Sequence, residues 1–126
     1  DPNEALIVSD YIHALSERLI IRTSVIGSSY SAATLISIAG TKGERCSLPS
    51  SEFLIHSLSI DGMYGKVDDV VSATKTLKKL SDRIATHISK STGQDIDVVQ
   101  KIMKEETYFN TSEAIEFGLV DKISAL

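Results

Sequence analysis

The sequence is short of several residue types, and each shortage excludes a class of protein. Its 126 residues include one cysteine, two prolines and no tryptophan. The single cysteine, Cys46, can form no internal disulfide and cannot supply a cysteine cluster for zinc. We therefore expect no metal site, and we expect a reducing compartment, the cytoplasm.

Long runs of one character are missing as well. No apolar run approaches the roughly 18 residues that can span a membrane, and no basic run exceeds the pair Lys78-Lys79. The net charge is −4, whereas nucleic-acid-binding faces gather basic residues. The sequence therefore predicts no membrane span and no nucleic-acid partner. Because the chain opens without methionine at "DPNEAL", we expect further residues upstream.

What the sequence does contain is an alternation of helical and extended patterns. Apolar residues recur at the helical period in several segments, and runs of β-branched residues lie between them. Gly40 is expected to end the second helix, and Thr111 or Ser112 to cap the last one. The alternation predicts a single α/β domain over residues 1–126 with a largely parallel sheet. The expected helices cover residues 1–16, 31–40, 66–90, 95–105 and 112–118, and the expected strands 19–27, 45–48, 52–58 and 119–123.

The stretch "GSSYSAATLISIAG" (residues 27–40) is the first candidate for chemistry. Ser31 follows a strand and a glycine turn and opens a helix, a place where a hydroxyl is exposed as a nucleophile. The N–H of Ala32 would then lie at the helix N-terminus, where the dipole favours an oxyanion. The alternative is that Ser31 or Ser29 only caps the helix, and the G-x-S-x-G elbow pattern is absent.

A serine nucleophile needs a base, and the sequence offers three histidines. His56 ends the apolar stretch "FLIH" beside a loop, from which it can reach a neighbouring element; its alternative is a core histidine. His13 and His87 lie among polar neighbours in helices, and we expect both at the surface. A carboxylate would have to orient the imidazole. Spacing does not choose among the candidates Asp61, Asp95, Asp97, Glu105, Glu106 and Asp121.

Two blocks of the sequence resemble the proteolytic-subunit (ClpP) family of Clp proteases. The first, "GSSYSAATLISIAGTKGERCSLPSSEFLIHS", is similar to the family segment with G-x-A-A-S-M, K-G-x-R, L-P and M-I-H. The second, "STGQDIDVVQKIMKEETYFNTSEAIEFGLVDKI", is similar to the family's T-G-Q, its aspartate-bearing segment and its E-A-x-x-Y-G-L-(I/V)-D ending. The positions in register are Gly27, Ser31, Leu35, Ala39-Gly40, Lys42-Gly43, Leu48-Pro49, Ile55-His56, Thr92-Gly93-Gln94, Glu113-Ala114, Phe117-Gly118-Leu119 and Asp121.

Carried over by position, the resemblance implies a serine peptidase site. Ser31 matches the family's nucleophile and His56 its general base, and Ala32 supplies an oxyanion N–H. The family's catalytic aspartate falls on Glu106, whose extra methylene displaces the carboxylate, and Glu105 beside it is the fallback. The family's Gly-Gly loop, which supplies the other oxyanion N–H, is expected immediately before Asp1. The resemblance thus implies that the chain is the C-terminal part of a longer protein.

The resemblance also implies an architecture and partners. The expected fold is the β-α superhelix that the family shares with the crotonases, with the helix 66–90 as a protruding "handle" between stacked rings. The alternative for this helix is that its apolar stripe packs on the chain's own sheet. The family forms homo-oligomeric rings of seven subunits, stacked as a 14-mer, around a chamber that receives polypeptides from an ATP-dependent unfoldase. No cofactor is implied for the subunit.

Four other functions remain open on the sequence. One is a catalytically weak or inactive ring or scaffold subunit. It is favoured by Glu106, which stands where the family has its catalytic aspartate, and by the residues beside Ser31 that depart from the family pattern. A phage-type head-maturation protease would act on one client. A serine–lysine peptidase would use a lysine as base, with Lys66, Lys75 and Lys78 as candidates. An acyl-CoA enzyme of the crotonase kind would share the fold only.

Overall fold

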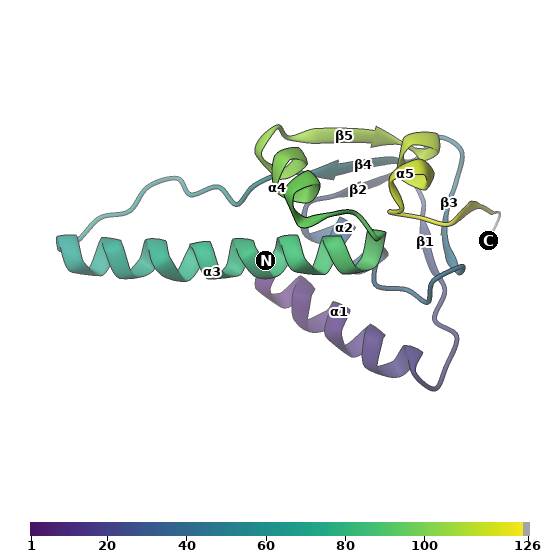
Figure 1. Cartoon of the computed structure of the whole chain (residues 1–126), viewed down its shortest axis with the longest axis horizontal. Helices are drawn as coiled ribbons and strands as arrows, with labels where there is room; N and C mark the ends of the chain where they lie inside the picture. The colour runs from purple at the N-terminus through teal and green to yellow at the C-terminus, as the bar shows by residue number, and fades with distance from the viewer. Residues whose placement is uncertain (125–126) are drawn as a thin grey trace.

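The structure is a computed structural model that describes residues 1–124. Helices and short strands alternate along most of the chain (Figure 1), so the fold class is mixed α/β, as predicted. The helices are α1 (Pro2–Ser16), α2 (Ala32–Ser37), α3 (Val67–Thr92), α4 (Ile96–Lys104) and α5 (Thr111–Phe117). The strands are β1 (Thr23–Val25), β2 (Ser28–Tyr30), β3 (Arg45–Ser47), β4 (Glu52–Ile55), β5 (Thr107–Asn110) and β6 (Lys122–Ile123).

The strands form two small sheets instead of one. The first has the order β1-β3-β6 and is parallel throughout, while in the second, β2-β4-β5, the β4–β5 pair is antiparallel. The expectation of largely parallel strands is therefore confirmed except at β5. The sequence pattern does not predict β2 or β5. Each strand is short and carries residues typical of turns, such as the serines of β2 and Asn110 of β5.

The short helix α2 lies at the centre of the molecule. It contacts α1, α3 and strands of both sheets, so its side chains are covered on several sides. Burial of such apolar side chains is the main favourable term in folding. The core that surrounds α2 contains Ala5, Leu6, Val25, Leu35, Ile38, Phe53, Ile55, Ile84, Ala85, Ile88, Val99, Met103, Phe109, Ala114, Leu119 and Val120.

Two helix ends differ from the prediction. The C-cap of α2 is Ile38, two residues before the expected Gly40. The reason for a glycine at position 40 is close packing, because a Cβ there would stand 2.5 Å from Thr23 Oγ1. The last helix is capped by Asn110, one residue before the expected Thr111, through a reciprocal pair of hydrogen bonds with Glu113.

The longest helix, α3, packs against the rest of the molecule only through its C-terminal part, and its N-terminal part is exposed. Its buried residues are confined to the C-terminal part, Ile84 to Ile88. The N-terminal part extends away from the sheets (Figure 1), and Val67 and Val71 on it are 78% and 46% exposed. The predicted helix is thus confirmed within two residues, and the apolar side chains of its first turns are not covered by the two sheets. No helix within residues 1–124 is both long and apolar enough to cross a lipid bilayer.

Candidate active site

Ser31 stands at the junction between β2 and α2, in a backbone conformation that residues other than glycine seldom adopt. Its φ is 56° and its ψ is −117°, outside the regions that an L-residue usually occupies. The hydrogen bond from the Ser31 N–H to the Leu54 carbonyl oxygen, 3.0 Å long, holds the junction against β4. A strained turn between strand and helix is the arrangement that exposes a nucleophilic serine.

The hydroxyl of Ser31 does not cap the helix that follows. Ser31 occupies the N-cap position of α2, yet its side chain makes no capping hydrogen bond. Ser29, the other capping candidate, is buried, and its hydroxyl oxygen lies 3.1 Å from that of Ser37. The interpretation of either serine as a mere helix cap is therefore wrong, and the Ser31 hydroxyl is available for other chemistry.

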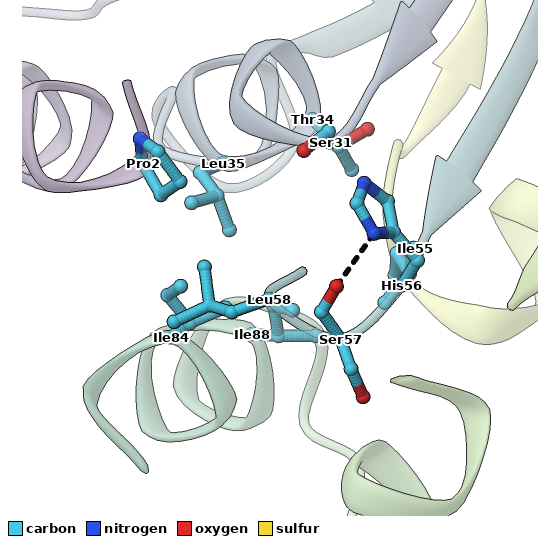
Figure 2. A pocket seen from close by; sticks show the side chains of 10 residues that line it. All are labelled: Pro2, Ser31, Thr34, Leu35, Ile55, His56, Ser57, Leu58, Ile84 and Ile88. Carbon is cyan, nitrogen blue, oxygen red and sulfur yellow. Dashed lines mark hydrogen bonds between the residues drawn. The ribbon is translucent and has the colours of Figure 1, made fainter. Parts of the chain in front are cut away.

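His56 comes directly after β4 and lines the same pocket as Ser31. Its Nδ1 lies 2.6 Å from the Ser57 carbonyl oxygen. A carbonyl oxygen can only accept, so Nδ1 carries the proton, and Nε2 of the neutral ring is unprotonated. Figure 2 shows that this second ring nitrogen is turned toward Ser31. The imidazole therefore has the tautomer that a general base next to Ser31 requires.

The pocket between these two side chains is narrow and mostly apolar. Its volume is about 20 Å³, close to the space that one water molecule needs. Low polarity strengthens the interaction of any charge that develops there with the fixed dipoles around it. Apart from Ser31 and His56 the lining residues are Pro2, Thr34, Leu35, Ile55, Ser57, Leu58, Ile84 and Ile88 (Figure 2).

Ala32, the expected oxyanion donor, is the first residue of α2 and is half-buried. The first N–H groups of a helix have no acceptor inside the helix. Within residues 1–124 the Ala32 N–H has no hydrogen-bond acceptor. This N–H is therefore free to receive a ligand oxygen beside Ser31.

Glu106 falls opposite His56 when the register of β4 and β5 is continued by one residue. Its carboxylate nevertheless makes no hydrogen bond to the imidazole. Ile55 pairs with Thr107 across the antiparallel strands β4 and β5, so Glu106 comes one register step beyond, at the level of His56. The residue is exposed, and its φ of 51° takes it out of the strand conformation. Nδ1 of His56 donates its hydrogen bond to the Ser57 carbonyl oxygen instead.

The other ionisable candidates lie elsewhere. Asp121 accepts hydrogen bonds from buried Arg45, at 2.6 Å from Nη2 and 2.9 Å from Nε. Burial of the Asp121 carboxyl raises its pKa, but the bonds from Arg45 outweigh this and lower the pKa. Glu105 is the C-cap of α4, 4.0 Å from Lys101. The remaining candidates are exposed and do not line the pocket: Asp61, Asp95, Asp97, Lys66, Lys75 and Lys78.

His87 is buried, contrary to the prediction that it lies at the surface. Only 8% of it is exposed, and its Nε2 lies 2.8 Å from the Leu35 carbonyl oxygen of α2. Burial lowers the pKa of His87, although the bond to Leu35 opposes the shift. The polar neighbours in sequence occupy the outer face of α3, while His87 shares the inner face with Ile84 and Ile88.

Sequence reasoning missed Thr34, which lines the pocket beside Ser31. Its only signal is that a hydroxyl residue interrupts the apolar run of the predicted helix 31–40. In the structure it is 1% exposed, so its hydroxyl must find acceptors within the protein. Residues 1–124 contain no cluster of three side chains able to hold a metal ion.

The fold and the site together define a class: a mixed α/β protein with a serine at a strained strand–helix junction and a histidine beside it. The Clp protease family model matches residues 3–125. The chain therefore belongs to the Clp protease family, as the sequence resemblance indicates.

Two curated relatives place the chain within that family. The ATP-dependent Clp protease proteolytic subunit 1 of Bifidobacterium longum (strain NCC 2705) is 31% identical over 103 residues, 82% of this chain and 44% of that protein. The subunit of the same name from Thermobifida fusca (strain YX) is 30% identical over 103 residues, 82% of this chain and 46% of that protein. The chain thus spans less than half the length of these relatives.

Proposed function

We propose that the protein containing this chain is a Clp-type serine endopeptidase, with Ser31 as the nucleophile and His56 as the general base. The observation that carries the proposal is the strained Ser31, whose hydroxyl caps nothing, in one pocket with an imidazole whose Nδ1 donates to the Ser57 carbonyl oxygen and whose Nε2 is left to act as the base. Membership of the Clp protease family supports the same reaction class.

The proposed reaction proceeds by acyl transfer. Ser31 Oγ attacks the scissile carbonyl carbon while His56 Nε2 takes the hydroxyl proton, and the imidazolium then gives that proton to the leaving amine. The Ala32 N–H stabilises the oxyanion. A water molecule attacks the acyl carbon while His56 takes its proton, and the acyl–Oγ bond then breaks as His56 returns the proton to Ser31, which releases the carboxylic acid product. The Ser57 carbonyl keeps the proton on Nδ1 throughout and so holds the reactive tautomer.

Glu106 is the proposed third member of the site. A backbone carbonyl can fix the tautomer of His56 but carries no full charge, whereas a carboxylate also stabilises the imidazolium. The register of β4 and β5 supports this role, because Glu106 is one step from the pair Ile55 and Thr107. Its side chain is exposed and therefore free to change rotamer.

The assembly is proposed to be a homo-oligomeric ring, of seven subunits and stacked as a 14-mer, that receives polypeptides from an ATP-dependent unfoldase. Two relatives are named proteolytic subunits of ATP-dependent proteases. The N-terminal part of α3 exposes Val67 and Val71, which supports its proposed role as the handle between rings. Light scattering of the intact protein should give a mass of seven or fourteen subunits, and a monomer would refute the ring.

A second candidate function is a catalytically weak or inactive ring subunit. The observation that favours it is the position of Glu106, which leaves His56 oriented by the Ser57 carbonyl alone.

A fluorophosphonate probe decides between the two functions. The intact, assembled protein should be labelled, Ser31→Ala should abolish labelling, and Ser28→Ala, which alters an exposed serine at the start of β2, should retain it. An unlabelled wild-type protein would support the inactive subunit. Labelling that survives His56→Ala but is lost on substitution of Lys66, Lys75 or Lys78 would establish the serine–lysine alternative.

A further inference from the structure

We propose that Thr34 is a positioning residue that sets the distance between Ser31 and His56, an inference that rests on the proposed peptidase function. Thr34 is 1% exposed and lies one helical turn after Ser31. Its Oγ1 donates toward two carbonyl oxygens, those of Ser29 at 2.5 Å and Leu54 at 3.2 Å. One hydroxyl therefore joins α2 to both β2 and β4.

The two acceptors occupy equivalent places relative to the reacting residues. Ser29 precedes Ser31 by two residues on β2, and Leu54 precedes His56 by two residues on β4. The Leu54 carbonyl also accepts from the Ser31 N–H at 3.0 Å. The Thr34 hydroxyl thus joins β2 to β4 at two carbonyl groups, each of which lies two residues before the reacting side chain on its strand.

Thr34 also closes the turn that contains Ser31. Its own N–H donates to the Ser31 carbonyl oxygen at 3.0 Å, so Thr34 is bonded both to the strained residue and to Ser29, which precedes Ser31 by two residues. A residue with positive φ persists only where its surroundings hold it. Because Thr34 does not point its hydroxyl at Ser31 Oγ or at His56, its effect on the reaction comes through their placement (Figure 2).

The chain offers a matched control in Thr111. It is 2% exposed, it lies in the first turn of a helix as Thr34 does, and its Oγ1 donates to two carbonyl oxygens, Leu48 at 2.9 Å and Ser51 at 3.2 Å. It does not line the pocket of Ser31 and His56. Loss of either hydroxyl leaves buried carbonyls short of one donor, so the two variants share a structural cost and differ only in their relation to the site.

The test compares Thr34→Val with Thr111→Val in the intact protein. Thr34→Val should slow fluorophosphonate labelling and kcat for a peptide by roughly 10- to 100-fold, because a shift of about 1 Å can cost 100-fold. Thr111→Val should change neither by more than about twofold, although both variants melt at lower temperature. Thr34→Ser, which keeps the hydroxyl, should restore kcat to within about threefold. KM should move little in all three.

Three results would overturn the inference: Thr34→Val with wild-type kcat, Thr34→Ser as slow as Thr34→Val, or equal losses of kcat in the Thr34 and Thr111 variants. If Thr34→Val does not fold, Thr34→Cys keeps a weak donor of similar size, and kcat should then fall between the wild type and Thr34→Ala. Failure of the peptidase proposal looks different, because the wild-type protein itself would then be neither labelled nor active.

Discussion

Two regions of the molecule carry a strained residue, and they hold it in opposite ways. Among residues 1–124, Ser31 and Glu106 are the two non-glycine residues with positive φ, at 56° and 51°. Ser31 is half-buried, its N–H donates to the Leu54 carbonyl oxygen of β4, and its own carbonyl oxygen accepts from the Thr34 N–H. Glu106 is exposed, and its N–H makes one long hydrogen bond, 3.3 Å, to the Met103 carbonyl oxygen. Each such conformation costs about 1–3 kcal/mol, so both need an explanation.

The difference indicates which part of the site is prepared before substrate arrives. The turn of Ser31 continues into α2, whose Leu35 carbonyl accepts from Ser9 Oγ of α1 at 2.9 Å and lies 2.8 Å from His87 Nε2 of α3. Ser31, the proposed nucleophile, is therefore held by contacts among three helices and a sheet. The acidic residue has no comparable support, so its contribution should be smaller and easier to change.

Removal of the Ser31 side chain should have the largest effect and should separate activity from stability. Ser31→Gly should lower peptide hydrolysis by about 10³-fold or more, as loss of a nucleophile does. Glycine adopts positive φ without strain, so the free energy of unfolding should stay the same or rise by up to about 1 kcal/mol. Peptidase assays and denaturant unfolding measure the two quantities. Retained hydrolysis, or a large loss of stability, would refute the assignment.

The Glu106 carboxylate should matter less than Ser31 and more than its neighbour. Glu106→Gln should lower kcat/KM by about tenfold, since the amide cannot stabilise the imidazolium as a carboxylate does. Glu105→Gln is the control, because Glu105 is also exposed but ends α4 next to Lys101; it should change kcat/KM by less than about twofold. Equal small effects would mean that the Ser57 carbonyl is sufficient to orient His56.

A glycine at position 106 should increase stability at the expense of activity. Glu106 adopts a left-handed conformation directly after the C-cap of α4, a position where glycine is common. Glu106→Gly should raise the free energy of unfolding by up to about 1 kcal/mol while activity falls as far as in Glu106→Gln. Calorimetry checks the first part, and a destabilised variant would show that the Glu106 side chain supports the turn.

The smallest expected effect is a pH dependence of stability from His87. Its pKa lies below the ordinary 6.5 in the folded protein, so below about pH 6.5 the unfolded chain binds the proton more readily. The free energy of unfolding should therefore fall as the pH drops from 6.5 toward the folded pKa, and be unaffected by His87 above 6.5. His87→Gln, which can still donate to Leu35, should make the free energy of unfolding less dependent on pH in this range. If the variant shows the same pH dependence as the wild type, His87 is not its source.

The sequence predicts most of the fold because its helices carry strong local signals. Asp1 caps α1, with its Oδ1 accepting from the Asn3 and Glu4 N–H groups, and the long helix α3 ends at Gly93 in a left-handed cap. The short strands β2 and β5 carry no such signal, because pairing with β4 decides them. Long-range pairing overrides local propensity in such segments.

The site could be predicted only in part. Ser31 and His56 follow from the family resemblance, and the structure brings both to one pocket. The orienting carbonyl of Ser57 has no signal in the sequence, because every residue has a carbonyl and only folding selects this one. Thr34 was missed for a related reason: a threonine in an apolar helix acquires its role only when both strands lie beside it.

Mapping of a covalent adduct would show directly whether Ser31 is the nucleophile. The intact protein is treated with a fluorophosphonate, digested, and examined by tandem mass spectrometry. We expect one phosphonyl group, on Ser31, and no labelling after His56→Ala. A modified residue other than Ser31, such as Ser28, or an unmodified assembled protein would contradict the claim that the strained junction between β2 and α2 holds the nucleophile.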